Sequence, residues 1–375
     1  MSEFLIATWH GGGNVAPAMV VAAELRRRGH TVRFLGHESQ QVAFTAAGFA
    51  FAPYQGVRPF DGTTPNSVPR LVSMMTDTRL GRAVLAELAT RPVDVVLADC
   101  LLVPVQRACA DAGQPYVSLE HLFDAYLRRG WLRGPVGTVA RLKGLRPVAT
   151  WSRAAHCLVG APASLDPAAA GPTPTNVRFV GPLLNLPPRH ALDSHDPAVL
   201  VSLSTFHYPG MQPALQRMLD ATANLDARVI VTTGPVIDPA SLRTAPNHEV
   251  HRFVSHDTLM PQVSLVVGHG GHATTMRALA HDLPLVVMPM HPLLDQPMVG
   301  RAVANAGAAQ VVTKKVAPAD LRRVVERMLT DGPHRHAAAT LGEEIRQLDA
   351  TTRAADLLED VATRNTARHP SADQG

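Results

Sequence analysis

The sequence has too few cysteines, and the wrong spacing between them, for a metal site or a disulfide framework. Its 375 residues include three cysteines, Cys100, Cys109 and Cys157, and no interval between them matches a metal-binding pattern. An odd number of cysteines is typical of reduced thiols in a cytosolic protein. We therefore expect a cytoplasmic protein whose thiols are reduced and that binds no metal.

Dense charge and long apolar stretches are also missing. The longest basic run is Arg26-Arg27-Arg28 and the formal net charge is only +4, so we expect no nucleic acid as a partner. No stretch reaches the ~20 apolar residues that a transmembrane helix needs. The N-terminus also lacks a basic region followed by a long apolar run. We expect neither stable membrane insertion nor a secretion signal.

The sequence does contain short apolar runs that alternate with helical segments. At 375 residues it is long for a single core. The alternation begins at residues 4–9, stops at a proline-rich segment after Gly181-Pro182, and restarts at residues 199–203. This pattern predicts an α/β protein with two doubly wound, Rossmann-like domains that face a cleft. We expect domains at 1–185 and 198–345, a linker at 186–197, a C-terminal helix at 346–364 and a disordered tail at 365–375.

The first predicted strand ends in a glycine turn that lacks the spacing of a dinucleotide-binding site. Gly11-Gly12-Gly13 does not give G-x-G-x-x-G, because Ala16 takes the position of the last glycine. We therefore expect no nicotinamide cofactor at this turn.

A second glycine turn, in the C-terminal half, is better suited to a ligand. The apolar run at 265–267 is followed by Gly270-Gly271, which lets the backbone come close to a bound group. We expect Thr274 and Thr275 to open the next helix. A helix start presents unpaired N–H groups and the positive end of the helix dipole, which together favour a phosphate.

Polar residues follow the next predicted strand, which ends at Pro289. Asp295 offers hydrogen-bond acceptors, and Gln296 offers both a donor and an acceptor. Such a pair is suited to recognising a polyhydroxyl compound. One short region thus offers a diphosphate cradle beside a sugar clamp.

The motif His269-Gly270-Gly271-x-Ala273-Thr274, with Pro289 and Asp295-Gln296 after it, resembles the donor-binding motif of family 1 glycosyltransferases of the GT-B fold. It is most similar to that of bacterial enzymes that decorate antibiotics and other natural products, and the resemblance extends over nearly the whole chain. It implies that the first domain binds an acceptor and that the second binds a nucleotide sugar. It also implies that the C-terminal helix crosses back to the first domain.

The resemblance further implies a role for each residue that matches the motif. The donor diphosphate is expected to contact His269, Gly270, Gly271, Thr274, Ser204 and Thr205. The sugar is expected to contact Asp295 and Gln296, and the base to contact Phe253 and Val254, where Phe253 replaces a stacking tryptophan of the family. Thr274 and Asp295 have a structural alternative, since both residue types cap helices.

One departure from the family concerns the nucleotide. Plant members hold both ribose hydroxyls with a glutamate on the motif helix, and the matching position here is Arg277. Loss of that acceptor suits a deoxyribose, so a dTDP-sugar is favoured over a UDP-sugar.

A second departure concerns the catalytic base. Many relatives carry His or Asp three residues before the proline that opens the first long helix, and here that residue is Asn14. A neutral amide cannot take a proton, although it can orient the acceptor. His10 and Asp99 are alternative bases, since His10 follows the first strand and Asp99 matches the acid that orients the base of the family. His121 is a third candidate.

These features predict an inverting, metal-independent glycosyltransferase. It would move a (deoxy)sugar from a dTDP- or UDP-sugar co-substrate to an acceptor group of a small hydrophobic natural product, without a cofactor, and a homodimer is compatible with this role. Two other classes remain open. One is a sugar-nucleotide epimerase with the same architecture. The other is a non-catalytic auxiliary homologue of a partner transferase, which the asparagine at position 14 would suit.

Overall fold

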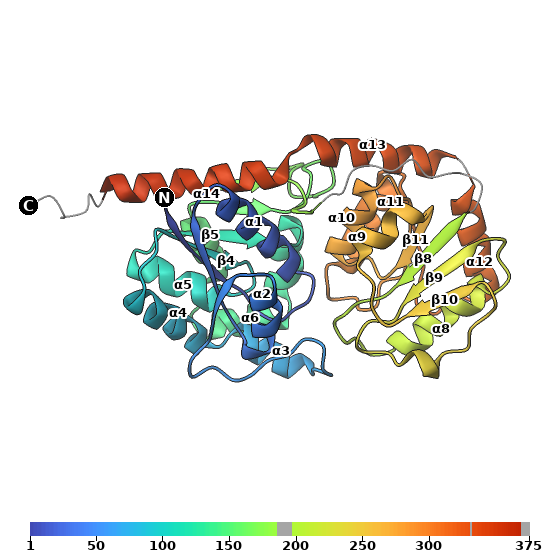
Figure 1. Ribbon diagram of the computed structural model, residues 1–375, viewed down its shortest axis with the longest axis horizontal. Helices are drawn as coiled ribbons and strands as arrows, with labels where there is room; N and C mark the ends of the chain where they lie inside the picture. The colour runs from blue at the N-terminus through green and yellow to red at the C-terminus, as the bar shows by residue number, and fades with distance from the viewer. Residues whose placement is uncertain (186–196, 331, 369–375) are drawn as a thin grey trace, which may run out of the picture. The chain divides into compact units, whose positions relative to one another are not determined.

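The computed structural model describes residues 1–185, 197–330 and 332–368 (Figure 1). Within these ranges the chain divides into two compact units. Unit 1 comprises residues 1–61, 66–184 and the chain after 348, and unit 2 comprises residues 62–65 and 185–348. The linker predicted at 186–197 lies outside the described residues except for Pro197.

Unit 1 is a seven-stranded parallel sheet in the order β3-β2-β1-β4-β5-β6-β7. Its strands are β1 Glu3–Ala7, β2 Thr31–Gly36, β3 Ala50–Pro53, β4 Val95–Asp99, β5 Tyr116–Glu120, β6 Cys157–Val159 and β7 Val177–Phe179. Its helices are α1 Val15–Arg27, α2 Gln41–Ala46, α3 Val68–Met75, α4 Thr78–Thr90, α5 Val103–Ala112, α6 Pro135–Leu142, α7 Pro147–Arg153 and α14 Ala350–Arg368. A 3-10 turn at Glu38–Gln40 and a π-helical turn at Tyr126–Trp131 complete it.

Unit 2 is a six-stranded parallel sheet in the order β10-β9-β8-β11-β12-β13. Its strands are β8 Ala198–Ser202, β9 Arg228–Thr232, β10 His248–His251, β11 Leu265–Gly268, β12 Leu285–Val287 and β13 Ala309–Val311. Its helices are α8 Met211–Thr222, α9 His256–Leu259, α10 His272–Ala280, α11 Gln296–Asn305, α12 Pro318–Leu329 and α13 Pro333–Gln347, and 3-10 turns lie at Pro239–Ser241 and Met260–Gln262. The predicted α/β class with two doubly wound sheets is confirmed.

The central strands of both sheets are covered on both faces. Phe4, Leu5 and Ile6 of β1 are at most 1% exposed, and so are Val266 and Val267 of β11. Strands that are buried on both sides have continuous apolar sequences rather than alternating ones. This is why short apolar runs located the strands in the sequence.

Each sheet reverses its strand order once, between its first strand and the fourth strand of that sheet. In unit 1 the reversal lies between β1 and β4, where Ala7 is paired with Ala98. In unit 2 it lies between β8 and β11, where Ser202 is paired with Gly268. The loops leave the sheet in opposite directions at such a point and open a crevice at the carboxyl ends of the strands. Each unit therefore has a natural ligand site beyond these two strands.

The last helix, α14, packs within unit 1 alongside α1 (Figure 1). Its Ala354 and Leu358 are fully buried in the same core cluster as Leu25 of α1. Arg28 and His30, which follow α1, both contact Glu359 at 2.6 Å and 2.7 Å. An apolar seam flanked by ion pairs thus attaches the end of the chain to its beginning.

Two helical stretches of the chain contain a break. α3 and α4 are separated at Asp77, whose side chain accepts a hydrogen bond from the N–H of Arg79 at 3.0 Å and starts a new helix. The helix predicted at 346–364 is wrong at both ends. α13 ends at Gln347 and α14 begins at Ala350, because Asp349 has a left-handed φ of 44°.

The tail predicted at 365–375 is partly wrong. α14 continues to Arg368, so residues 365–368 are helical. Residues 369–375 lie outside the described residues. None of the helices in the described ranges has the length and apolar character needed to cross a bilayer.

Replacing Leu358 by alanine should destabilise unit 1 by ~2–5 kcal/mol, because it leaves a cavity in the seam between α14 and α1. All three tryptophans, Trp9, Trp131 and Trp151, belong to unit 1. Urea denaturation followed by their fluorescence therefore measures the free energy of unfolding of this unit. Leu142, which is 82% exposed, provides a matched control whose change to alanine should cost no more than ~0.5 kcal/mol. Equal losses for both variants would contradict the packing described for α14.

Candidate functional site

Glycines shape the turn that follows β11. Gly270 has a left-handed φ of 77°, and a Cβ there would lie 2.5 Å from Cγ1 of Val287. A Cβ on Gly268 would lie 2.9 Å from the carbonyl oxygen of Ser202. Both positions therefore exclude a side chain. The turn brings bare backbone to the carboxyl end of the sheet at the point where the strand order reverses.

Helix α10 begins earlier than expected from the threonines. Gly271 is its N-cap, with φ −64° and ψ 136°, and His272 is the first helical residue. The prediction that Thr274 opens or caps the helix is therefore wrong, because the extended Gly271 already ends the turn. Thr274 lies in the first turn and is half-buried. The N–H groups of this turn are available to an anion.

His269 lies against this helix start. Its side chain is 7% exposed, and among the described residues Nδ1 has no hydrogen-bond partner. A Cβ on Gly271 would lie only 2.4 Å from Nε2, so the glycine makes room for the ring. Burial, followed by the neighbouring His256, lowers the pKa of His269 to about 4. At neutral pH the ring is uncharged, and a buried nitrogen without a partner indicates a missing ligand.

A hydroxyl and histidine cluster, missed in the sequence, lies beside it at the ends of β8 and β9. Oγ1 of Thr232 donates to Oγ of Ser202 at 2.7 Å, and Nε2 of His256 lies 3.1 Å from the same oxygen. Burial, followed by the charge of Arg277, lowers the pKa of His256 to about 4. The only sequence signal for this cluster is a small hydroxyl residue at the end of each apolar run.

The other predicted phosphate contacts follow β8. Oγ of Ser204 accepts the N–H of Phe206 at 2.9 Å, and the Ser204 side chain also hydrogen-bonds Tyr208. Thr205 is exposed. Tyr208 lies nearby with its ring centroid 6.4 Å from that of His269. Burial raises the pKa of Tyr208, and the nearby Asp295 raises it further.

Asp295 and Gln296 lie at the start of α11. Asp295 occupies the N-cap position but makes no side-chain cap hydrogen bond. Gln296 is 1% exposed, and its Oε1 accepts the backbone N–H groups of Met290 at 2.7 Å and His291 at 3.3 Å. The amide oxygen therefore holds the loop after β12 in place. The Gln296 side chain also hydrogen-bonds the hydroxyl of Tyr208.

The predicted base-binding residues follow β10. Phe253 is 73% exposed, which is unusual for a phenyl ring, and Val254 is half-buried. Nε of Arg277 lies 2.6 Å from Oδ1 of Asp257, with side chains 14% and 37% exposed. The charge of Arg277 is therefore compensated by a carboxylate. Asp257 thus places a hydrogen-bond acceptor beside Arg277, the position that matches the glutamate of the plant members.

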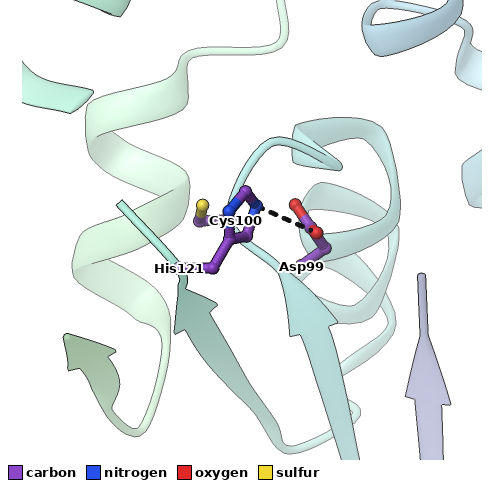
Figure 2. Close-up of side chains that lie close together, drawn as sticks. All are labelled: Asp99, Cys100 and His121. Atoms are coloured by element: carbon purple, nitrogen blue, oxygen red, sulfur yellow. Dashed lines mark ion pairs between the residues drawn. The ribbon is translucent and has the colours of Figure 1, made fainter. Parts of the chain in front are cut away.

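In unit 1, Asp99 is the centre of a buried hydrogen-bond network at the end of β4. Its Oδ2 accepts from Nδ2 of Asn14 at 2.8 Å and lies 3.2 Å from Nε2 of His121 (Figure 2). Its Oδ1 accepts the N–H of Leu101 at 2.9 Å. Nδ2 of Asn14 also donates to the carbonyl oxygen of Trp9 at 3.0 Å. The structure thus brings together three of the residues considered for proton transfer.

Asp99, Cys100 and His121 form the single group in the described residues whose ligand atoms are close enough to share a metal ion, within 4.8 Å of one another. Their chemistry does not fit a metal. Figure 2 shows the Cys100 thiol and the Asp99 carboxylate on either side of the His121 ring. Burial raises the pKa of Cys100 well above its usual range, and both Asp99 oxygens already accept hydrogen bonds. We interpret the group as a hydrogen-bond network.

His10 lies apart from this network. Its Nδ1 is 2.9 Å from Oγ of Ser39 and 3.2 Å from Oδ1 of Asp61. Its side chain is 22% exposed, whereas that of His121 is 9% exposed. Of the two histidines, His10 is the more accessible to a ligand.

Replacing Gly270 by alanine should destabilise unit 2 by more than the cost of placing alanine at a left-handed φ. Gly210 is the matched control, because its φ of 83° is similar and no atom lies within 4 Å of an added Cβ. Gly210→Ala should cost ~1–2 kcal/mol through backbone strain. Gly270→Ala should cost a further ~1–3 kcal/mol, because the new Cβ overlaps Val287. Hydrogen exchange of the β11 and β12 amides measures both, and equal losses would contradict the predicted clash.

Unit 2 should lose stability as the pH falls from about 6.5 to about 4. The folded pKa of His269 is depressed to about 4 from the ordinary 6.5. As the pH falls, the unfolded chain therefore binds a proton at this histidine before the folded chain does. The stability that neutral His269 contributes is complete above pH 6.5 and is lost progressively as the pH falls toward 4. His269→Gln should make the pH slope shallower by up to ~1.4 kcal/mol per pH unit. Hydrogen exchange of β11 measures the slope, the exposed His336→Gln is the control, and an unchanged slope in His269→Gln would contradict the prediction.

The chain is similar to known proteins both in sequence and in structure. Residues 216–360 match the family described as erythromycin biosynthesis protein CIII-like, C-terminal domain. The 4'-demethylrebeccamycin synthase of Lentzea aerocolonigenes is 34% identical over 199 residues, which are 50% of this chain and 46% of that protein. The tylactone mycaminosyltransferase of Streptomyces fradiae is 35% identical over 133 residues, 34% of this chain and 28% of that protein. The chain thus spans about half the length, or less, of these curated relatives.

Solved structures match almost the whole chain. The calicheamicin glycosyltransferase CalG4 superimposes with a TM-score of 0.78 at 22% identity, covering 97% of this chain and 99% of that one. The glycosyltransferase VinC, solved in complex with dTDP, gives 0.70 at 21% identity, covering 96% and 100%. The predicted resemblance to bacterial antibiotic glycosyltransferases is confirmed. The chain therefore has the GT-B fold, and its residues 216–360 are similar to the EryCIII-like C-terminal domain family.

Proposed function

We propose that the protein is an inverting glycosyltransferase that moves a sugar from a nucleotide sugar to an acceptor group of a small hydrophobic natural product. The observation that carries this proposal is the start of α10. There a bare glycine turn, unpaired helix N–H groups and the unpartnered nitrogen of buried His269 meet where the strand order reverses. The family match of residues 216–360 supports the same conclusion.

The donor diphosphate would be bound by neutral hydrogen-bond donors. His269 has a lowered pKa and one N–H to offer, and the first turn of α10 offers backbone N–H groups with the positive dipole end. The hydroxyls of Ser204, Thr205 and Thr274 supply further donors. As the bond to the anomeric carbon breaks, negative charge grows on the diphosphate, and these preorganised donors would stabilise it without a metal.

The sugar and the base would lie on either side of the diphosphate. Asp295 and Gln296 would contact sugar hydroxyls, and the contacts of Gln296 with the loop after β12 and with Tyr208 would keep its side chain rigid. The exposed ring of Phe253, with Val254 beside it, offers a face on which a base can stack. The solved complex of VinC with dTDP is consistent with a dTDP-sugar donor.

The ion pair between Arg277 and Asp257 bears on the choice between deoxyribose and ribose. Arg277 by itself would leave a ribose hydroxyl without an acceptor, which favours dTDP. Asp257 lies 2.6 Å from Arg277 and could accept that hydroxyl instead. We retain dTDP as the preferred nucleotide and expect Asp257 to weaken the preference rather than reverse it.

Inversion requires a base on the acceptor side, opposite the leaving group. Asp99 is poorly suited, because both of its oxygens already accept hydrogen bonds in a buried site. His121 is 9% exposed and directs Nε2 to Asp99. His10 is more exposed, so we assign the base to His10. Asn14 donates to Asp99, which leaves its buried Oδ1 to orient the acceptor.

The proposal predicts that dTDP and UDP both raise the melting temperature of the protein, and that dTDP raises it more. It also predicts that dTDP-sugars yield free dTDP together with a glycoside of a phenolic probe such as 4-methylumbelliferone. His269→Ala and Gly271→Ala should each weaken dTDP binding by ~10-fold or more. The first removes a donor, and the second places a Cβ against the His269 ring at a φ that alanine tolerates. Calorimetric titration with dTDP measures the binding.

The exposed His336→Gln is the control and should bind dTDP as the unaltered protein does. Failure of dTDP and UDP to bind would overturn the donor site. Binding of dTDP without glycoside formation from any dTDP- or UDP-sugar, across a panel of phenols and alcohols, would instead favour a non-catalytic auxiliary protein.

A further inference from the structure

His10 is held by two oxygen atoms on the same ring nitrogen. Its Nδ1 lies 2.9 Å from Oγ of Ser39, in the 3-10 turn after β2, and 3.2 Å from Oδ1 of Asp61 in the loop that follows β3. Both contacts lie in unit 1. They join the glycine turn after β1 to the loop that follows β3.

The directions of these hydrogen bonds follow from the chemistry of the partners. Ser39 has one hydroxyl proton, and it donates that proton to the carbonyl oxygen of Phe60 at 3.0 Å. Oγ of Ser39 can therefore only accept from His10, and a carboxylate such as Asp61 can only accept as well. Nδ1 must then carry the proton. In the neutral ring the lone pair lies on Nε2, the nitrogen on the other side of the imidazole.

The loop that carries Asp61 is itself fixed. Nδ2 of Asn66 donates to the backbone carbonyl oxygen of Asp61 at 2.8 Å. The preceding Phe60 is 3% exposed, and its ring lies 5.8 Å from those of Trp9 and His37. The buried ring of Phe60 and the hydrogen bond from Asn66 thus hold the Asp61 carboxylate near His10.

We propose that Asp61 is a positioning residue for His10, fixing the tautomer and the orientation in which Nε2 takes the proton of the acceptor. This inference rests on the proposed glycosyl transfer. It explains how the chain can work with asparagine at position 14. The buried carboxylate of Asp99 accepts a hydrogen bond from the amide of Asn14. The pairing of a carboxylate with an accessible imidazole is made instead by Asp61 and His10.

The step is balanced in protons and electrons. The acceptor oxygen forms a bond to the anomeric carbon while its proton moves to Nε2 of His10. The bond between that carbon and the diphosphate breaks, and its electron pair leaves with the diphosphate. His10 becomes an imidazolium, whose charge faces the carboxylate of Asp61, and it later returns its proton to solvent. His37, which is buried, is a further titratable side chain near His10.

Asp61→Asn tests the tautomer, because the new amide can donate to Nδ1 and move the ring proton to Nε2. The full chain is labelled with ¹⁵N-histidine, and the His10 signals are assigned by their loss in His10→Gln. We expect the Nδ1–H tautomer in the unaltered protein and a shift toward Nε2–H in Asp61→Asn. An Nε2–H tautomer in the unaltered protein, or no shift in the variant, would overturn the proposal.

The kinetic arm measures kcat for transfer from a dTDP-sugar to the phenolic probe. Asp61→Asn should lower kcat by ~10²–10³-fold, and Asp61→Glu, which restores a carboxylate, should recover part of the loss. The exposed Asp226→Asn controls for loss of a charge and should leave kcat unchanged. Calorimetric dTDP affinity should be the same in Asp61→Asn, since the assigned donor residues belong to unit 2.

The two proposals fail in different ways. If the unaltered protein transfers sugar and Asp61→Asn transfers it at the same rate, the role of Asp61 is wrong and the proposed function stands. If no dTDP- or UDP-sugar is used at all, the proposed function fails and the positioning role of Asp61 in that reaction fails with it, whatever the tautomer of His10.

Discussion

The reversal of strand order in each sheet is the constraint on which the candidate sites depend. Parallel strands place all their carboxyl ends at one edge, and connections diverge only where the order reverses. In unit 1 this point lies between β1 and β4, next to Asn14 and Asp99. In unit 2 it lies between β8 and β11, next to Ser202 and His269. The polar groups gather there because elsewhere the strands are enclosed by apolar side chains.

Much of this arrangement could be predicted from the sequence, for a physical reason. A strand that is buried on both faces needs a continuous apolar run, and such runs are visible without an alignment. The turn at Gly270-Gly271 was equally visible, since a positive φ and close packing against Val287 leave glycine as the suitable residue. The fold class and the location of the proposed donor site follow from these local requirements.

Other features could not be predicted, because they depend on contacts between distant segments. From the sequence, Asp77 resembles a residue inside a helix, whereas in the structure its side chain caps α4. Gln296 has hydrogen-bonding groups suited to a sugar, yet its oxygen holds the loop after β12. The contact of His10 with Asp61 joins two separate loops and has no periodic or motif signal. The sequence could name His10 as a candidate base, but it could not name the carboxylate beside it.

In the proposed mechanism, burial separates the groups that would hold the ligand from the group that would exchange a proton with it. Asp99 is 4% exposed, and a carboxylate in that position must have its oxygens satisfied by hydrogen bonds. The N–H of Leu101 satisfies Oδ1 and the amide of Asn14 satisfies Oδ2, with Nε2 of His121 3.2 Å from the same oxygen, so both oxygens are already engaged. His269 is buried as well, and its lowered pKa keeps it neutral, so it is suited to donate a hydrogen bond rather than to carry charge. Proton transfer is then left to a histidine that is partly open to solvent and has a lone pair free of the network, and His10 has both properties.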